Sequence, residues 1–177
     1  MKFTPTKIPG AYLIEIEPIT DERGFFARSF CTDEFQRHEL DTNFVQCNVS
    51  FTAQRGTIRG MHYQVAPDTE TKLVRCTRGA IYDVILDLRP ESPTFKQWVA
   101  EELTADNHQM FYIPSGCAHG FQTLVNDTEV FYQMSGVYNA AAARGVRWDD
   151  PAFGIEMPLV VSMINQRDRS HSNFRNG

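Results

Sequence analysis

The chain has 177 residues, 42% of them hydrophobic and 22% charged, with a formal net charge of -5. This size and composition predict one domain with a substantial core over residues 1–177, and the negative charge argues against a nucleic-acid partner bound by counterion release. No apolar run is long enough to cross a bilayer, the first residues lack the apolar region of a secretory signal, and the four cysteines contain no CxxC pair. We therefore expect a cytoplasmic protein with reduced thiols and no membrane partner.

The N-terminal part of the chain combines short strand signals with one helix signal. Alternation of apolar and polar side chains over residues 11–17 predicts a strand, and the polar run at residues 20–24 predicts a turn. Thr32 is the predicted N-cap of a helix that ends near Leu40, because the residues after Thr32 are acidic and favour the positive end of the helix dipole.

Residues 44–51 alternate again and divide into an apolar and a polar face. Gln46, Asn48 and Ser50 share the polar face. In a sandwich such a face is usually exposed to solvent, whereas in a barrel it lines a ligand cavity. The sequence leaves both interpretations open.

Residues 57–64 predict a strand that contains an imidazole and a guanidinium group. Strict alternation would place Arg59 and His62 on opposite faces of this strand. Gly60 lies between them, at a position where a β-bulge would turn both side chains toward the same side. We therefore predict that Arg59 and His62 both point inward.

The middle of the chain predicts three hairpins, because short apolar segments flank turn residues. The expected pairs are 72–77 with 80–88 around Arg78 and Gly79, 98–103 with 110–113 around Asp106 and Asn107, and 121–125 with 129–135 around Asn126 and Asp127. Short strands at even spacing with few helices predict an all-β fold, an antiparallel sandwich or barrel. After Tyr138 the chain is predicted to be irregular.

Four basic side chains lie in strands whose other residues are mostly apolar or small: Arg59, His62, Lys72 and Arg75. Charge is costly in such surroundings unless a ligand or a carboxylate compensates it. A binding site explains the cluster, and so does a basic sheet edge with structural ion pairs. Other motifs are needed to choose between them.

The run from Ile113 to Phe121 contains a PxGxxH pattern that ends at His119 and resembles the second motif of the cupin superfamily. This resemblance implies a cupin-type double-stranded β-helix, that is, a jelly-roll barrel. Metal-binding cupins carry an HxH pattern in their first motif, whereas this chain offers only His62 there. Two imidazoles are too few ligands for a metal, so we expect none.

With further motifs, the chain resembles the dTDP-4-dehydrorhamnose 3,5-epimerase family over roughly residues 8 to 170. The motifs that carry the resemblance, all in the family's order, are DERGFF at 21–26, QCN at 46–48, IRGMHYQ at 58–64, KLVR at 72–75, DLR at 87–89 with SPT at 92–94, IPSGCAHGF at 113–121, Trp148 with DP at 150–151, and RDR at 167–169. Eight ordered motifs make an accidental match improbable.

The resemblance implies a nucleotide-sugar epimerase that uses neither metal nor cofactor and forms a homodimer. In the family pattern His62 is the base, Asp168 orients and charges it, and Tyr132 is the acid on the opposite face of the sugar, with Lys72 near the 4-keto oxygen. The other implied contacts with the substrate come from Arg23 and Arg59 at the diphosphate, Phe26 at the pyrimidine, and Gln46, Asn48, His119, Tyr138 and Arg167. Residues 1–30 are expected to contribute to the dimer, with the segment around Arg23 completing the partner's site, and residues 160–177 form a tail that carries Asp168.

These roles also make chemical sense of the residues. Inverting a carbon next to a ketone requires a base that removes a proton and an acid that returns one to the other face, and His62 and Tyr132 suit these tasks. The enolate that forms between the two steps needs a fixed cation, which Lys72 supplies. A buried Asp168 would stabilise the imidazolium.

Each assignment has an ordinary structural alternative. Tyr132 alternates with apolar neighbours and fits a core tyrosine, His119 fits a residue that orients a loop, and Asp168 lies in a polar run that fits a solvated surface. His38, His108 and His171 are interpreted as surface residues.

The chain departs from the family pattern at several positions, so the reaction type is better supported than the substrate. Arg28 replaces a glutamate, Cys47 an acidic residue and Arg167 a lysine, while a glutamate is lost within residues 140–143. A charge reversal such as Arg28 would alter recognition. The leading hypothesis is inversion of C3 and C5 of dTDP-4-dehydro-6-deoxy-D-glucose. The alternatives are inversion of one centre, a different nucleotide sugar, a non-catalytic sugar-nucleotide-binding barrel, and a metal-dependent cupin enzyme.

Overall fold

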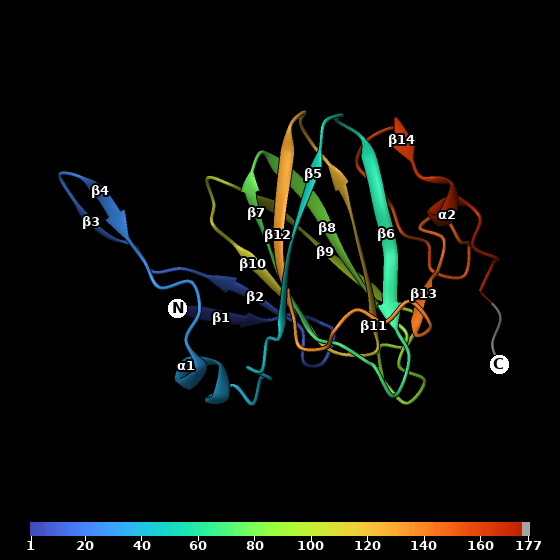
Figure 1. The fold of residues 1–177 in the computed structure, drawn as a ribbon, viewed down its shortest axis with the longest axis horizontal. Helices are drawn as coiled ribbons and strands as arrows, with labels where there is room; N and C mark the ends of the chain where they lie inside the picture. Colours follow the sequence, from blue (N-terminus) through green and yellow to red (C-terminus); the bar gives the residue numbers. More distant parts are fainter. Residues whose placement is uncertain (175–177) are drawn as a thin grey trace.

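The computed structural model describes residues 1–174, and within them the chain forms two sheets that face each other (Figure 1). The strands of the first sheet are, in spatial order, β1 (Lys2–Pro5), β2 (Tyr12–Glu15), β10 (Met110–Ile113), β7 (Lys72–Arg78), β12 (Thr128–Met134) and β5 (Gln46–Thr52). Those of the second are β13 (Ala143–Gly145), β6 (Thr57–Gln64), β11 (Cys117–Thr123), β8 (Ala80–Asp87) and β9 (Trp98–Thr104), with β14 (Met163–Ile164) beside β6.

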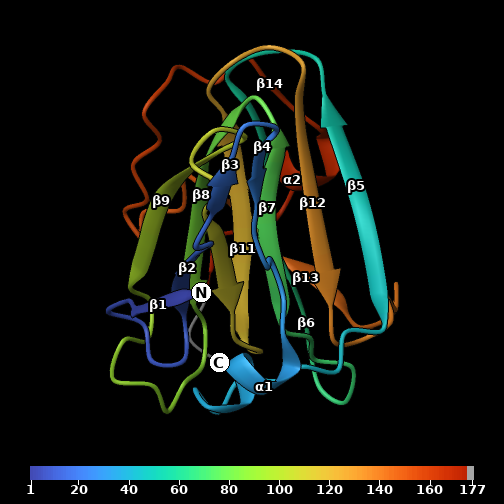
Figure 2. The same ribbon diagram turned by 90° about the vertical axis from the view of Figure 1, so that its left-hand side faces the viewer.

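Three smaller elements complete the described structure. Strands β3 (Ile19–Asp21) and β4 (Gly24–Phe26) form a separate hairpin, and the two helices are α1 (Thr32–Gln36) and α2 (Gln166–Arg169). In Figure 1 the β3–β4 hairpin projects away from the barrel, and in Figure 2, where that side faces the viewer, it lies in front of the sheets. No helix within residues 1–174 is long and apolar enough to span a membrane.

The core lies between the sheets and continues onto their outer faces. Val74, Ile85 and Phe111 are fully buried in the central cluster, to which both sheets contribute. The next residues along β7 and β10 point the other way and pack against Phe35 of α1, which covers part of the first sheet. The segment around Phe153 covers the outer face of the second sheet in the same manner. This arrangement follows from the two-residue period of a strand, which alternates its side chains between faces.

The prediction of an all-β jelly-roll barrel with one or two short helices is confirmed, but the predicted hairpins are wrong. The turn at Gly79 leads from β7 in the first sheet to β8 in the second. The turns between β9 and β10 and between β11 and β12 likewise cross from one sheet to the other. Turn residues indicate where the chain reverses but not which strand it pairs with next. Because successive strands change sheets, both sheets contribute side chains to the space between them.

Several boundaries also differ from the prediction. The helix predicted from Thr32 to about Leu40 ends at Gln36, and Cys31 rather than Thr32 occupies the N-cap position. The PxGxxH motif ends inside β11, which begins at Cys117 rather than at residue 121. The predicted strand at 11–17 is the shorter β2. Local patterns fix element ends poorly because tertiary pairing decides them. Residues 175–177 of the predicted tail lie outside the described residues.

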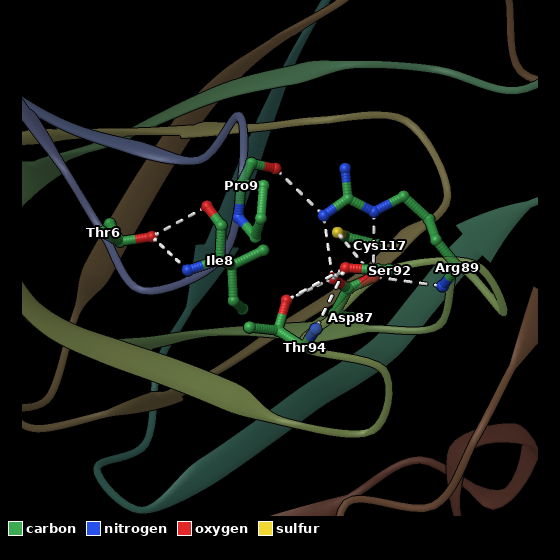
Figure 3. A network of polar contacts seen from close by, with 8 residues as sticks. All are labelled: Thr6, Ile8, Pro9, Asp87, Arg89, Ser92, Thr94 and Cys117. Atoms are coloured by element: carbon green, nitrogen blue, oxygen red, sulfur yellow. Dashed lines mark hydrogen bonds and ion pairs between the residues drawn. The ribbon is translucent and has the colours of Figure 1, made fainter.

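A buried carboxylate fastens the long connection between β8 and β9, as Figure 3 shows. Asp87 accepts hydrogen bonds from the Arg89 guanidinium and from the hydroxyls of Ser92 and Thr94. The same guanidinium donates to the carbonyl of Pro9, at 2.9 Å. Burial opposes ionisation of Asp87, but the hydrogen bonds outweigh it and hold the pKa of this carboxyl far below its usual range. Arg89, held by the Asp87 carboxylate, therefore links the β8–β9 connection to the N-terminal segment at Pro9.

Candidate active site

A cavity of about 380 Å³ opens between the two sheets. Strands from both sheets line it, together with residues of α2. Ten of the twelve predicted site residues lie on its walls: Gln46, Asn48, Arg59, His62, Lys72, His119, Tyr132, Tyr138, Arg167 and Asp168. A cavity of this volume suits a ligand of the size of a hexose and part of an attached phosphate group.

The other two predicted residues, Arg23 and Phe26, lie on the projecting β3–β4 hairpin. Arg23 pairs with Asp21 of the same hairpin, and both side chains are exposed to solvent. Phe26 is 72% exposed. Neither residue is among those that line the cavity within residues 1–174. The folded chain thus brings together the predicted catalytic group but leaves the two hairpin residues apart from it.

Strand β5 resolves the open question about its polar face. Gln46, Asn48 and Ser50 line the cavity, so this face does not belong to an ordinary solvated sheet. The opposite face carries Val49 and Phe51, which are exposed. On β5, an edge strand of the first sheet, the usual order of apolar inside and polar outside is therefore inverted.

Strand β6 carries both predicted basic groups into the cavity, which confirms the expected bulge at Gly60. The pairing of β6 with β11 shifts register between His62 and Arg59. Gly60 has φ of 115°, a value that other residues rarely adopt. A Cβ atom at Gly60 would lie 2.6 Å from the Cα of Gly120, so glycine is also required by the close approach of the two strands. The irregularity allows Arg59 and His62 to face the same space.

His62 forms a hydrogen-bonded pair with Asp168. Its Nε2 lies 2.7 Å from Oδ1 of Asp168, and Oδ2 accepts from the backbone N–H of Gly60 at 3.1 Å. Asp168 is only 1% exposed, so the interpretation of this residue as a solvated surface charge is wrong. Burial opposes ionisation of Asp168, but the hydrogen bond and charge of His62 outweigh burial and lower the pKa of the carboxyl. The carboxylate therefore stays ionised beside the ring.

Helix α2, which the sequence did not predict, places Asp168. Its N-cap is Asn165, whose side-chain oxygen accepts from the backbone N–H of Asp168 at 2.7 Å. The Asn165 amide also donates to Oδ2 of Asp168 at 3.2 Å. A four-residue helix has no apolar periodicity, so the cap residue was its only sequence signal.

Tyr132 satisfies both of the interpretations that the sequence allowed. It lies on β12, packs against the central core cluster and lines the cavity. Burial raises the pKa of its phenol, with the charge of Arg59 acting in the opposite direction. The hydroxyl therefore keeps its proton at neutral pH and is available as a donor.

His119 is held inside β11 rather than in a loop. Its Nε2 lies 2.7 Å from Oδ1 of the fully buried Asp83. The other oxygen of Asp83 is buried and has no hydrogen-bond partner within residues 1–174. Burial raises the pKa of Asp83, and the charge of His119 acts in the opposite direction. The carboxyl fixes the orientation of His119 on the cavity wall.

The cations of the cavity make contacts that orient them. Arg59 donates from Nε to the Thr52 hydroxyl and from Nη2 to the carbonyl of Phe51, both at 2.9 Å. Lys72 is paired with Glu70. Guanidinium groups match the oxygens of a phosphate well, so the cavity suits an anionic ligand.

Nine further residues line the cavity and were not in the predicted set. Glu70 pairs with Lys72 but precedes β7, so the two-residue period of that strand did not indicate it. Arg144 lies on β13, which pairs with β6, and nothing local indicates that pairing. The additional residues are Ser50, Tyr63, Gln64, Glu70, Phe121, Met134, Ala143, Arg144 and Asn165.

The departures from the family pattern lie in different places. Arg28 pairs with Glu34 at 2.7 Å and does not line the cavity within the described residues. Cys47 points outward from β5 and is exposed. All four cysteines lie within residues 1–174 and are free thiols. Ala143, in the segment that lost its glutamate, lines the cavity together with Arg167. Of these departures, those at Ala143 and Arg167 are the ones that lie on the cavity wall within the described residues.

His171 differs from the surface position expected for it. Its ring lies against Gly145, and its Nε2 is buried without a hydrogen-bond partner in the described part of the chain. Burial lowers the pKa of His171, with the charge of Asp168 acting in the opposite direction. His38 is exposed and stacks on Phe3, and His108 is half-buried. Among residues 1–174, no three His, Cys, Asp or Glu side chains are arranged to hold a metal ion.

Comparison with known proteins extends these observations to nearly the whole chain. A family model described as dTDP-4-dehydrorhamnose 3,5-epimerase matches residues 5–176. The protein of that name from Sinorhizobium fredii is 42% identical over 171 residues, covering 96% of this chain and 88% of the relative.

Solved structures with bound ligands are among those similar to this chain. The epimerase from Bacillus anthracis, with TDP and PPi bound, superposes with a TM-score of 0.94 at 42% identity, over 98% of this chain and 99% of that one. The dTDP-6-deoxy-D-glucose-3,5-epimerase from Legionella pneumophila, in complex with dTDP-4-keto-L-rhamnose, gives a TM-score of 0.88 at 34% identity, over 95% and 89% of the two chains. Agreement in sequence, fold and extent shows that the chain belongs to the dTDP-4-dehydrorhamnose 3,5-epimerase family.

Proposed function

We propose that the protein inverts C3 and C5 of dTDP-4-dehydro-6-deoxy-D-glucose and so forms dTDP-4-dehydro-L-rhamnose. The observation that carries this proposal is the His62–Asp168 pair on the wall of a cavity that Tyr132 also lines. A base and an acid around one hexose-sized space are what two inversions next to a ketone require. Membership of the epimerase family supports the same reaction.

His62 is the base. Because its Nε2 is engaged by Asp168, the other ring nitrogen, Nδ1, is free to take a proton from the carbon beside the ketone. The electron pair of that C–H bond moves into an enolate. The carboxylate of Asp168 then stabilises the imidazolium, as in a hydrolase triad.

Lys72 and Tyr132 complete the reaction. The ammonium of Lys72 stabilises the negative charge that develops on the former keto oxygen, a contribution that is strongest in the transition state. The Tyr132 phenol gives its proton to the carbon from the opposite face. The phenolate then takes a proton from solvent and the His62 imidazolium releases one to solvent, which restores both groups for the second carbon. The pKa of the phenol, raised by burial, keeps that proton in place until the enolate forms.

The remaining predicted residues bind the substrate. Arg59 holds the diphosphate together with Arg23, and Phe26 stacks on the thymine ring. Further contacts along the ligand come from Gln46, Asn48, His119, Tyr138 and Arg167. The reaction is expected to need no metal or other cofactor, because a base, an acid and a fixed cation suffice to move a proton at a carbon beside a ketone.

The active form is a homodimer in which the hairpin completes the partner's cavity. Exposed apolar side chains occur on the projecting hairpin, at Ile19, Phe25 and Phe26, and on the outer face of the edge strand β5. Apolar groups and an unpaired edge at these positions favour association with a second copy. The free cysteines favour a reducing compartment, so the dimer acts in the cytoplasm.

Mixing two inactive variants tests the shared site. A dimer of one His62→Ala chain and one Arg23→Ala chain contains one cavity with both residues intact, if the hairpin serves the partner. Activity should then return after mixing and subunit exchange, to about one quarter of wild type if the chains pair at random. Mixtures that remain as inactive as the separate variants would show that each chain uses its own hairpin.

Deuterium labelling tests the reaction itself. In heavy water the wild-type enzyme should produce a sugar that NMR shows to carry deuterium at both C3 and C5, because each inversion returns a solvent proton. Label at one carbon would identify a single-centre epimerase. Binding of the nucleotide sugar without any label would identify a non-catalytic binding protein and contradict the proposal.

A further inference from the structure

The wall of the cavity contains a buried ion pair whose acidic member, Glu70, has no role in the proposed reaction. Oε1 of Glu70 lies 2.8 Å from Nζ of Lys72, and the two side chains are 3% and 9% exposed. Both residues line the cavity. An ion pair withdrawn from water to this extent has a large desolvation cost, which makes it a poor device for stability alone.

The hydrogen bonds of the Lys72 ammonium leave one of its N–H donors available to a ligand. An ammonium has three N–H donors. One is directed at Glu70, and a second at the backbone carbonyl of His62, 3.3 Å away. The third has no partner in the described part of the chain, while the Lys72 side chain lies on the cavity wall. Two protein contacts therefore leave a single donor for the ligand.

The position of Glu70 is itself fixed from several sides. A Cβ atom at Gly136 would lie 3.3 Å from the Cβ of Glu70, so the side chain has little room on that side. The next residue, Thr71, exchanges hydrogen bonds with Ser135 through its N–H and its carbonyl. Oε2 of Glu70 is buried and has no hydrogen-bond partner within residues 1–174, so Lys72 is the group that compensates this carboxylate.

We infer that Glu70 is a positioning residue, which holds the Lys72 ammonium so that its third N–H points at the oxygen where enolate charge develops. This inference rests on the proposed function. Lysine has a flexible four-carbon side chain that loses considerable rotamer entropy when held in one place. The contact with Glu70 fixes the Lys72 side chain before the substrate binds, so the rotamer entropy is lost in advance. A charge that is already in position stabilises the developing enolate most effectively in the transition state. Glu70 acts through Lys72 and does not itself contact the substrate.

The test is a double-mutant cycle on the rate of deuterium exchange, with Glu70→Gln, Lys72→Gln and the double variant. Glu70→Gln should lower kcat about 10- to 100-fold, the cost of a misplaced catalytic group, and leave KM nearly unchanged. In the Lys72→Gln background the same substitution should cause no further loss, because its target is already gone. Titration with dTDP counts folded sites, so that each kcat refers to folded enzyme.

A control variant replaces a partly buried glutamate that lies outside the cavity. Glu129 accepts a hydrogen bond from the Thr77 hydroxyl at 2.7 Å, and Glu129→Gln should exchange like wild type. An equal loss from Glu70→Gln in both backgrounds, a large rise in KM, or an unchanged kcat would overturn the role of Glu70 alone. Absence of exchange in the wild-type enzyme would contradict the proposed function, and this role with it.

Discussion

The His62→Ala variant is expected to lose deuterium exchange, with kcat falling about 10,000-fold, at the upper end of what a general base contributes. The methyl group of alanine cannot accept the proton from the carbon, and neither Asp168 nor Lys72 can substitute. Asp168 is buried behind the ring and is engaged by Gly60, and Nζ of Lys72 is held by Glu70 and by the backbone carbonyl of His62. The measurement is NMR of the nucleotide sugar after incubation in heavy water.

A loss of activity supports this role only if the variant still binds ligand. His62→Ala leaves the Asp168 carboxylate buried beside an empty space, which lowers stability. Calorimetric titration with dTDP should show that the folded variant retains the binding site. His38→Ala serves as the matched control, because His38 lies outside the cavity and stacks on Phe3. Normal exchange by folded His62→Ala would mean that another residue is the base.

The Tyr132→Phe variant is expected to separate proton removal from inversion. Net epimerisation should fall about 1,000-fold, within the range for loss of a general acid, while deuterium still enters the recovered substrate. His62 can still form the enolate, but without the phenol only His62 returns a proton, and it does so to the face from which the first was taken. The phenyl ring keeps the packing of Tyr132 against the core.

Comparing label in the substrate with label in the product measures this separation. In wild type the inverted product carries the label, whereas in Tyr132→Phe unreacted substrate should acquire it without a change in configuration. Tyr112→Phe is the matched control, because that buried hydroxyl binds the backbone of Asp41 and does not line the cavity within residues 1–174. Equal losses of exchange and inversion in Tyr132→Phe would assign Tyr132 a structural role.

The strands were predictable because their signal is local, whereas their pairing was not. The two-residue period identifies β5, β6, β7 and β12 to within a few residues. The turn at Gly79 looks like that of a hairpin but leads to the other sheet. Which sheet a strand joins depends on the twist and closure of the whole barrel, and no window of the sequence contains that information.

The site residues also differ in whether a local sequence signal indicates them. Gly60 indicated the irregularity that turns Arg59 and His62 inward, because a glycine inside a strand often marks a bulge or a close approach of two backbones. Asp168 was recognised only through the family motif, since its burial depends on contact with β6, more than a hundred residues away in sequence. Glu70 was not predicted, because a carboxylate that lies close to a lysine in the sequence usually belongs to an exposed pair.

His62 and Tyr132 are proposed to act on opposite faces of one sugar ring. A crystal structure of the enzyme with a bound, unreactive dTDP-hexose would reveal this arrangement. Nδ1 of His62 should lie within about 3.5 Å of C3 or C5 on one face, with the Tyr132 hydroxyl on the other face. A hexose with both side chains on the same face, or a hexose bound outside the cavity, would contradict it.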